Sequence, residues 1–162
     1  MTRECGACTL CCKVMGIHEL DKPYGVWCPH CKPGSGCGIY ETRPASCRTF
    51  TCGWLSDETI PDALRPDRSK VVLYFSANGQ KLIARCDPGH PTAWRREPLY
   101  GQLKRWAARG WAEHVLVTPM VGDRTWVLTP NHEVDLGVVD PGARLAIAEQ
   151  PDGTVAVTVA PR

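Results

Sequence analysis

Cysteine is the residue whose number and spacing could do chemistry in this chain. The sequence holds 10 cysteines in 162 residues, and all but Cys86 lie in its first third. So dense a cluster needs cross-linking, either by disulfide bonds or by a metal that thiolates coordinate. The clustered cysteines are, in chain order, Cys5, Cys8, Cys11, Cys12, Cys28, Cys31, Cys37, Cys47 and Cys52.

The choice between disulfide and metal depends on the cellular compartment. The sequence begins Met1-Thr2-Arg3-Glu4-Cys5 and lacks the apolar run of a secretion signal. No apolar stretch approaches the roughly 18 residues that a membrane span needs. We therefore expect a cytoplasmic protein without membrane contact, in which thiols stay reduced and clustered cysteines bind metal.

The C-x2-C pairs have a spacing that brings two thiolates from one tight turn onto one ion, as in zinc and iron–sulfur sites. Two such pairs stand 16 residues apart, Cys8-x2-Cys11 and Cys28-x2-Cys31. This spacing fits a zinc pattern, and a first pair of Cys5 and Cys8 fits it too, so the ligand partition stays open. Cys5, Cys8 and Cys11 also repeat the start of a ferredoxin run, which favours a four-iron cluster.

The number of centres depends on the adjacent pair Cys11-Cys12. We expect these two side chains to diverge, and either to serve two neighbouring centres or to include one that bridges them. Four thiolates hold one zinc ion or one four-iron cluster, so the clustered cysteines suffice for two. A thiolate centre is anionic and needs donors around it. Basic residues lie beside the cysteines and could supply them, namely Lys13, Lys32, Arg43 and Arg48.

The order of the cysteines resembles that of a known family. The run Cys5-x2-Cys8-x2-Cys11-Cys12, then Cys28, then Cys37-Gly-Ile-Tyr-Glu-Thr-Arg-Pro-x2-Cys47-Arg-x-Phe50 is similar to the YkgJ-type CxxCxxCC family of zinc- or iron-chelating proteins. The resemblance covers about residues 5–52 and implies metal chelation. It implies as ligands Cys5, Cys8, Cys11, Cys12, Cys28, Cys37 and Cys47. Cys31 and Cys52 are additions to the shared pattern.

The elements that must position these cysteines divide the chain in two. Residues 1–53 are punctuated by cysteine, glycine and proline and cannot build much apolar core, so a bound metal would supply folding free energy. Residues 54–162 have the composition of an ordinary domain. The sequence therefore predicts an α+β fold, in which an irregular cysteine-rich metal-binding region (1–53) packs on a small domain (54–162) of β-hairpins with one main helix.

The second region carries turn and helix signals. Asn78-Gly79 between apolar runs predicts a hairpin of strands 70–75 and 81–84. Pro98 and Gly110 suit the start and the end of a helix over 98–110. Further strands are expected at 115–118 and 125–128, and a last hairpin joins 145–147 to 155–157 across Pro151-Asp152-Gly153.

These patterns predict a metal-binding protein with one or two thiolate centres, iron–sulfur or zinc, for metal handling, electron transfer or support of a protein partner. A redox enzyme that uses the cluster and a zinc-based nucleic-acid-binding module stay open as alternatives. No catalytic motif supports the first alternative. For the second, tryptophans near basic residues 95–109 could stack on bases. We expect them in the core instead, and a net charge of +2 gives no drive toward nucleic acid.

Overall fold

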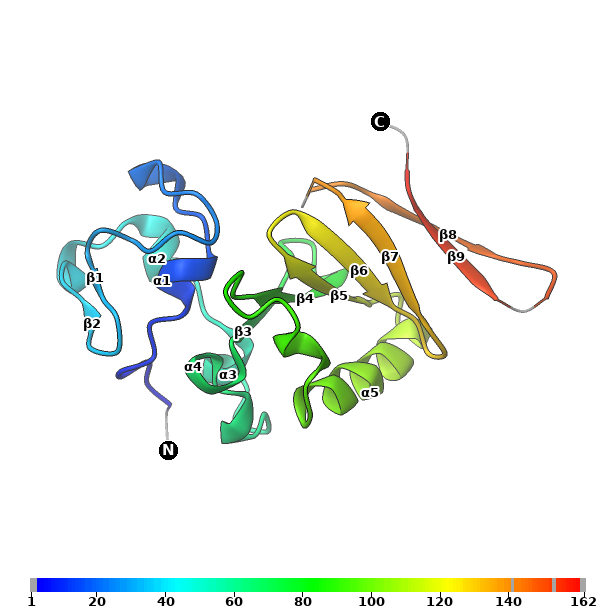
Figure 1. Ribbon diagram of the computed structural model, residues 1–162, viewed down its shortest axis with the longest axis horizontal. Coiled ribbons are helices and arrows are strands. Elements are labelled where there is room, and N and C mark those ends of the chain that lie inside the picture. The colour runs from blue at the N-terminus through cyan, green and yellow to red at the C-terminus, as the bar shows by residue number, and fades with distance from the viewer. Residues whose placement is uncertain (1–2, 141, 153, 161–162) are drawn as a thin grey trace.

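A five-stranded sheet forms the centre of the computed structural model, which describes residues 3–140, 142–152 and 154–160. The strand order is β3-β4-β5-β6-β7 (Figure 1). The strands are β3 (Val71–Phe75), β4 (Lys81–Cys86), β5 (Leu116–Val121), β6 (Arg124–Leu128) and β7 (Glu133–Val138). All neighbours are antiparallel except β4 and β5. The hairpin predicted at Asn78-Gly79 is confirmed, because β3 and β4 pair from Val71–Cys86 to Phe75–Leu82.

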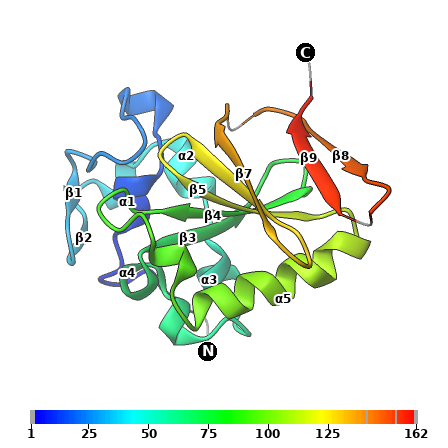
Figure 2. The same cartoon turned by 45° about the vertical axis from the view of Figure 1, so that its right-hand side comes forward.

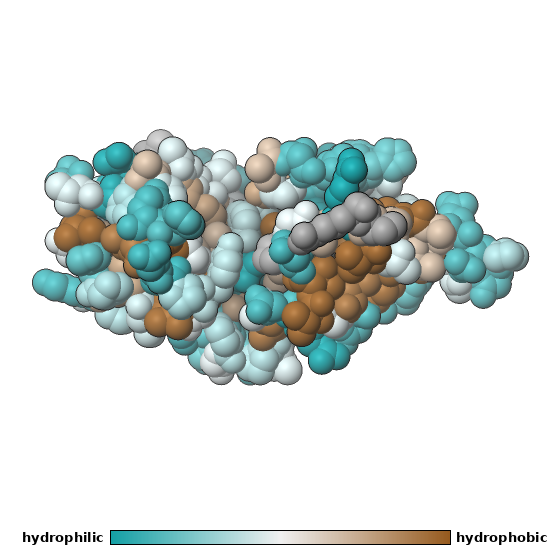
Figure 3. Space-filling view, turned by 90° about the horizontal axis from the view of Figure 1, so that it is seen from above, coloured by the Kyte–Doolittle hydropathy of each residue, from teal (hydrophilic) through white to brown (hydrophobic). Residues whose placement is uncertain are grey.

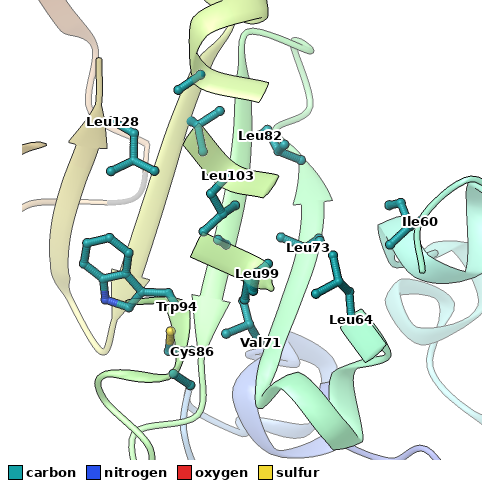
Figure 4. Close-up of a cluster of buried hydrophobic side chains, with 14 of the residues drawn as sticks. Ile60, Leu64, Val71, Leu73, Leu82, Cys86, Trp94, Leu99, Leu103 and Leu128 are labelled. Atoms are coloured by element: carbon teal, nitrogen blue, oxygen red, sulfur yellow. The ribbon is translucent and has the colours of Figure 1, made fainter. Parts of the chain in front are cut away.

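Helix α5 (Leu99–Ala112) connects the parallel strands β4 and β5 and covers one face of the sheet. A parallel pair needs such a crossover, because a tight turn reverses the chain and can join only antiparallel strands. Leu99 and Leu103 of α5 pack against alternate residues of β4, among them Leu82 and Cys86 (Figure 4). The predicted α+β class with one main helix is confirmed.

The predicted end of this helix at Gly110 is wrong, because α5 continues to Ala112. Gly110 is instead required by a close approach of the backbone. A Cβ atom there would lie 2.6 Å from the carbonyl oxygen of Val115. The Val115 N–H donates to the Gly110 carbonyl at 2.8 Å, and His114 takes the positive φ that turns the chain into β5.

The opposite face of the sheet is covered from two sides. At β3, Val72 packs with Leu10 and Val14 from the cysteine-rich region. At β5 and β6, a separate hairpin of β8 (Leu145–Glu149) and β9 (Val155–Val159) covers the sheet, with Val157 buried. This last hairpin was predicted, and Gly153 of its predicted turn lies outside the described residues. Figure 2 shows the hairpin at the end of the sheet away from the cysteine-rich region.

The chain before β3 consists of short elements. They are α1 (Cys11–Val14), η1 (His18–Leu20), β1 (Cys31–Lys32), β2 (Gly36–Cys37), η2 (Tyr40–Thr42), α2 (Ala45–Thr49), α3 (Gly53–Ser56), η3 (Asp62–Leu64) and α4 (Pro66–Ser69), and η4 (Ala93–Arg95) follows β4. The predicted boundary between 1–53 and 54–162 falls inside α3 and stays a prediction. In Figure 3 the cysteine-rich half shows a mostly hydrophilic surface with scattered apolar residues. No helix of the described ranges combines the length and apolar character needed to cross a membrane.

The tryptophans near residues 95–109 serve the core, as expected. Trp94 is fully buried, and Trp106 and Trp126 pack partly buried against the same cluster. Trp111 packs on the cluster beneath the β8–β9 hairpin. Arg95 stacks 3.7 Å above the Trp94 ring and pairs with Glu133 at 2.7 Å. These aromatic faces are therefore already engaged within the chain.

Gly110→Ala is expected to lower the free energy of unfolding by about 2 kcal/mol, because the added methyl group meets backbone that cannot yield. Gly101→Ala in the same helix is the matched control. Its Cβ would meet only the flexible carboxylate tip of Glu97 at 2.9 Å, so the better helix propensity of alanine offsets the contact. Chemical denaturation of both variants measures the difference, and equal stabilities would contradict this account of Gly110.

Candidate metal centre

The first four cysteines lie in the turn that leads into α1 and in its first residues. Cys8 N–H donates to the Cys5 carbonyl at 2.9 Å, which forms the tight turn that the C-x2-C spacing predicts. Cys11 and Cys12 then begin α1. Cys5 is exposed, and the other three thiols are half-buried. This stretch therefore presents its thiols near the surface of the molecule.

Cys28 and Cys31 are tied to α1 by the backbone. Cys28 N–H donates to the carbonyl of Cys12 at 2.9 Å, and Cys31 N–H donates to that of Cys28 at 3.0 Å. Cys37 then pairs with Cys31 across the β1–β2 ladder. The turn between these strands is held to the segment just before α1, because Gly34 N–H donates to the Thr9 hydroxyl at 3.1 Å. Three segments distant in sequence thus meet around α1.

The thiol of Cys12 lies close to those of Cys11 and Cys31. A hydrogen bond with Cys11, burial and the charge of Cys11 raise the pKa of Cys12. Burial, followed by the charge of Cys12, raises the pKa of Cys31 to about 12. The expectation that Cys11 and Cys12 diverge is therefore wrong. Consecutive side chains of a helix differ by only about 100° in direction, so both can reach a common point.

A second group contains Cys5, Cys8 and Cys52. Burial and then the neighbouring Cys8 and Cys12 raise the pKa of Cys5, so this group lies next to the first one. Burial also raises the pKa of Cys52, with further contributions from Cys5 and Cys8. Cys52 immediately precedes α3, so the chain returns to its first cysteines there. Cys52, which the family pattern does not include, therefore lies near Cys5 and Cys8.

Arginines lie beside this second group. The charges of Arg43 and Arg65 both act to lower the pKa of Cys5, opposing burial. Arg65 also donates to the Cys5 carbonyl at 3.1 Å. Arg43, one of the basic residues that the sequence places beside the cysteines, acts on Cys5. Sequence reasoning missed Arg65, which is 60 residues from Cys5 and becomes its neighbour only through the fold.

Cys47 lies in α2 and approaches the first group. Burial raises its pKa, and Cys12 and Cys28 add to the effect. By contrast, Cys86 is 1% exposed in the main core, as expected for a structural cysteine. The structure therefore brings some of the predicted cysteines close together. The described residues contain no set of three His, Cys, Asp or Glu side chains already placed for a metal ion.

The loop 17–22 contacts both short helices that carry cysteines, α1 and α2. Its ends form an isolated bridge in which Ile17 and Lys22 exchange two backbone hydrogen bonds, of 2.9 and 3.1 Å. The Glu19 carboxylate accepts bonds from Ser46 N–H at 3.0 Å and from Ser46 Oγ at 2.8 Å, next to Cys47. The Lys22 ammonium donates to the carbonyls of Lys13 and Met15 at the end of α1. No signal in the sequence marked either Glu19 or Lys22.

Polar and aromatic contacts dock the cysteine-rich region on the sheet. Lys13 Nζ lies 2.6 Å from Oδ1 of Asp87, whose side chain is 5% exposed. Arg85, a buried residue of β4, stacks 4.2 Å from the ring of Tyr24. Arg3 donates to four carbonyls between Trp54 and Ile60 at 2.7–3.1 Å. The region is thus fastened at the end of β4, on β4 itself and, through Arg3, to α3 and the segment after it.

The donor chemistry is that of thiolates, which hold zinc, iron–sulfur clusters and copper(I). The chain is cysteine-rich and several of its thiols lie close together, an arrangement compatible with metal binding. Neighbouring thiols that raise one another's pKa resist ionising together, because their negative charges repel. A bound metal cation offsets that repulsion. The chain matches no protein-family model, no curated protein and no solved structure, so the resemblance to the YkgJ-type family stays a prediction.

Asp87→Asn is expected to lower the free energy of unfolding at pH 7 by about 2 kcal/mol, because it leaves the partly buried Lys13 without its partner. Burial alone would raise the pKa of Asp87, but the Lys13 and Gly89 hydrogen bonds and the Lys13 charge outweigh burial and lower it. A lowered pKa means that the stabilisation is present above about pH 4 and is lost as the pH falls below that value.

Denaturation measured from pH 7 to pH 3 tests the Asp87 prediction. The difference between the wild type and Asp87→Asn should shrink below about pH 4. Asp135→Asn is the control, since Asp135 pairs with Arg124 at 2.6 Å on the exposed surface and solvent screens that pair. A difference at Asp87 that stays constant across this range would contradict the role of its charge.

Proposed function

We propose that this chain is a metal-binding protein that holds one or two cysteine-thiolate centres, either an iron–sulfur cluster or zinc. The observation that carries the proposal is the convergence of thiols from α1, α2 and the loop before β1. Cys12 is coupled to Cys11 and Cys31, and Cys47 is coupled to Cys12 and Cys28. Without a cation, neighbouring thiols oppose one another's ionisation. A metal ion bound between them stabilises the ionised thiolates.

The shortage of apolar core in this segment supports the proposal. Before Trp54, the buried hydrophobic side chains of the described residues are Leu10, Val14, Ile17 and the thiol of Cys28. So small a core stabilises about fifty residues poorly, and small domains of this kind rely on metals or disulfides. A metal bound by the clustered thiols would contribute folding free energy directly.

Exposure favours exchange with a partner over a closed structural site. Cys5 is exposed, and Cys8, Cys11 and Cys12 are half-buried. A metal or cluster held by these residues would lie within reach of a second protein or of free metal. Metal handling, electron transfer and support of a partner are the roles that such a position allows. The resemblance to the YkgJ-type chelating family supports the same class of function.

Metal analysis of the chain purified without oxygen tests the proposal. We expect at least one zinc ion or one four-iron cluster per chain, and a brown colour with broad visible absorption distinguishes the cluster. Cys8→Ser should lose at least half of the bound metal, because Cys8 lies in both candidate C-x2-C pairs. The control Cys86→Ala should keep its metal, since Cys86 lies in the main core.

The strands from Lys70 onward should stay folded in Cys8→Ser, while residues 3–53 lose protection against hydrogen exchange. Loss of protection throughout the chain would show that the cysteine-rich region and the sheet fold as one unit. The wild-type chain would contradict the proposal if it held less than one metal ion and exposed freely reactive thiols at Cys5–Cys52 while natively folded.

A further inference from the structure

The β8–β9 hairpin presents a free strand edge to solvent. At one end of its ladder, Ala160 N–H donates to the Arg144 carbonyl at 2.8 Å. At the other end, Gln150 N–H donates to the Thr154 carbonyl at 2.8 Å. Residues that bond to the partner strand alternate along an antiparallel strand with residues that do not. The backbone groups of the latter point away from β9, and on β8 these residues are Leu145, Ile147 and Glu149.

The other edge of the hairpin is turned toward the main sheet. β9 lies beside β7, and β8 lies on the outer side of β9 (Figure 2). The ring of His132, from the turn between β6 and β7, lies 3.2 Å from the Val155 carbonyl on the inner edge. Among the described residues, β8 pairs only with β9, and no other hydrogen bond reaches the backbone of its three outward-pointing residues.

Strand β3, at the far end of the main sheet, shows how this chain protects an edge. The Ser69 hydroxyl bonds both the N–H and the carbonyl of Val71, at 3.3 and 3.2 Å. Helix α3 lies against Leu73, whose carbonyl oxygen would be 3.4 Å from a Cβ atom at Gly53. β8 has no such cover, and it contains no proline, lysine or bulge that would block pairing.

The apolar side chains of the hairpin are incompletely covered. Ile147 of β8 is 44% exposed, although it lies opposite Val157, which is 4% exposed. A two-stranded hairpin is marginally stable, and an added strand stabilises it. An unprotected edge with an exposed isoleucine at its middle is suited to pairing with another extended strand.

The charges at the two ends of β8 indicate which strand that is. Arg144 precedes β8 and Glu149 ends it, both are exposed, and neither forms an ion pair with a described residue. Antiparallel pairing of two copies of β8 brings the Arg144 end of one strand beside the Glu149 end of the other. Parallel pairing would place like charges together, which is unfavourable. The edge is therefore complementary to itself in the antiparallel sense.

We propose that two copies of this chain associate by antiparallel pairing of their β8 edges, which joins the two hairpins into one continuous sheet. With Ile147 opposite the same residue of the second copy, all three outward-pointing residues of each strand form hydrogen bonds and the two isoleucines cover each other. A five-residue strand buries less than the roughly 1,200 Å² of a standard interface, so the dimer is weak, with a dissociation constant of about 10–100 µM. The hairpin lies at the end of the molecule away from the cysteine-rich region, so the pairing does not involve the metal centre (Figure 1).

Analytical ultracentrifugation of the full chain, purified without oxygen and kept reduced, tests the pairing over about 1 µM to 1 mM. A monomer–dimer equilibrium is expected. Ile147→Lys should weaken it at least tenfold, because a charge at the centre of an edge opposes pairing. Val159→Lys is the matched control, since it makes the same kind of change at a side chain that is 45% exposed but lies on β9. It should associate like the wild type.

Hydrogen exchange measured by NMR separates strand pairing from loss of the hairpin. The amides of Leu145, Ile147 and Glu149 should gain protection as the concentration of the wild type rises. The amides of Ala146 and Ala148 bond to β9 and should be protected at every concentration. Their protection in Ile147→Lys would show that this variant keeps its hairpin and loses only the pairing.

A charge exchange tests the antiparallel self-pairing. At low salt, Arg144→Glu or Glu149→Arg alone should raise the dissociation constant about threefold, because each places like charges at the same end of the paired strands. The double variant Arg144→Glu/Glu149→Arg should restore it to within about twofold, since it reverses both charges.

Three results would overturn the inference. The first is a chain that stays monomeric up to about 1 mM, even if its β8 edge captures an extended segment of another protein. The second is a dimer that Ile147→Lys leaves intact. The third is a dimer in which the outward-pointing amides of β8 exchange as fast as in the monomer. The proposed function is decided separately, by the metal content of the purified chain.

Discussion

The structure of the cysteine-rich region depends on thiols that lie together with little apolar packing around them. Among its described residues the buried aliphatic side chains are Leu10, Val14 and Ile17, and Leu10 and Val14 pack with Val72 of β3. Backbone bonds from Cys28 to Cys12 and from Cys31 to Cys28 determine the course of the loop before β1.

The sheet gives this region a rigid support. β3 and β4 are buried on both faces, by α5 on one side and by the cysteine-rich region on the other. The Lys13–Asp87 pair and the Tyr24–Arg85 stack join loops that carry cysteines to the end of β4. The cysteine-rich segment, with few buried apolar side chains of its own, is thereby anchored to a sheet that has its own buried core.

Sequence patterns predicted the parts of the fold that depend on local chemistry. Asn78-Gly79 located the first hairpin, and Pro98 located the start of the helix. The sequence did not reveal β7, because Asp135 and Gly137 interrupt its apolar alternation, although it pairs with β6 along its length. Gly110 was assigned to a helix end by its type, whereas a contact with Val115 explains it.

Of the candidate site, the C-x2-C turn at Cys5–Cys8 followed from spacing alone. The grouping of thiols did not, since Cys52 joins Cys5 and Cys8 only through the fold. Glu19, Lys22 and Arg65 act across long stretches of sequence and carry no local signature.

The central claim is that thiolates of the cysteine-rich region coordinate a metal. X-ray absorption spectroscopy at the metal edge of the chain, purified without oxygen, tests it most directly, because it identifies the atoms bound to the metal. The account predicts a first shell dominated by sulfur at about 2.3 Å. A first shell of oxygen and nitrogen, or a chain with no metal to measure, would contradict it.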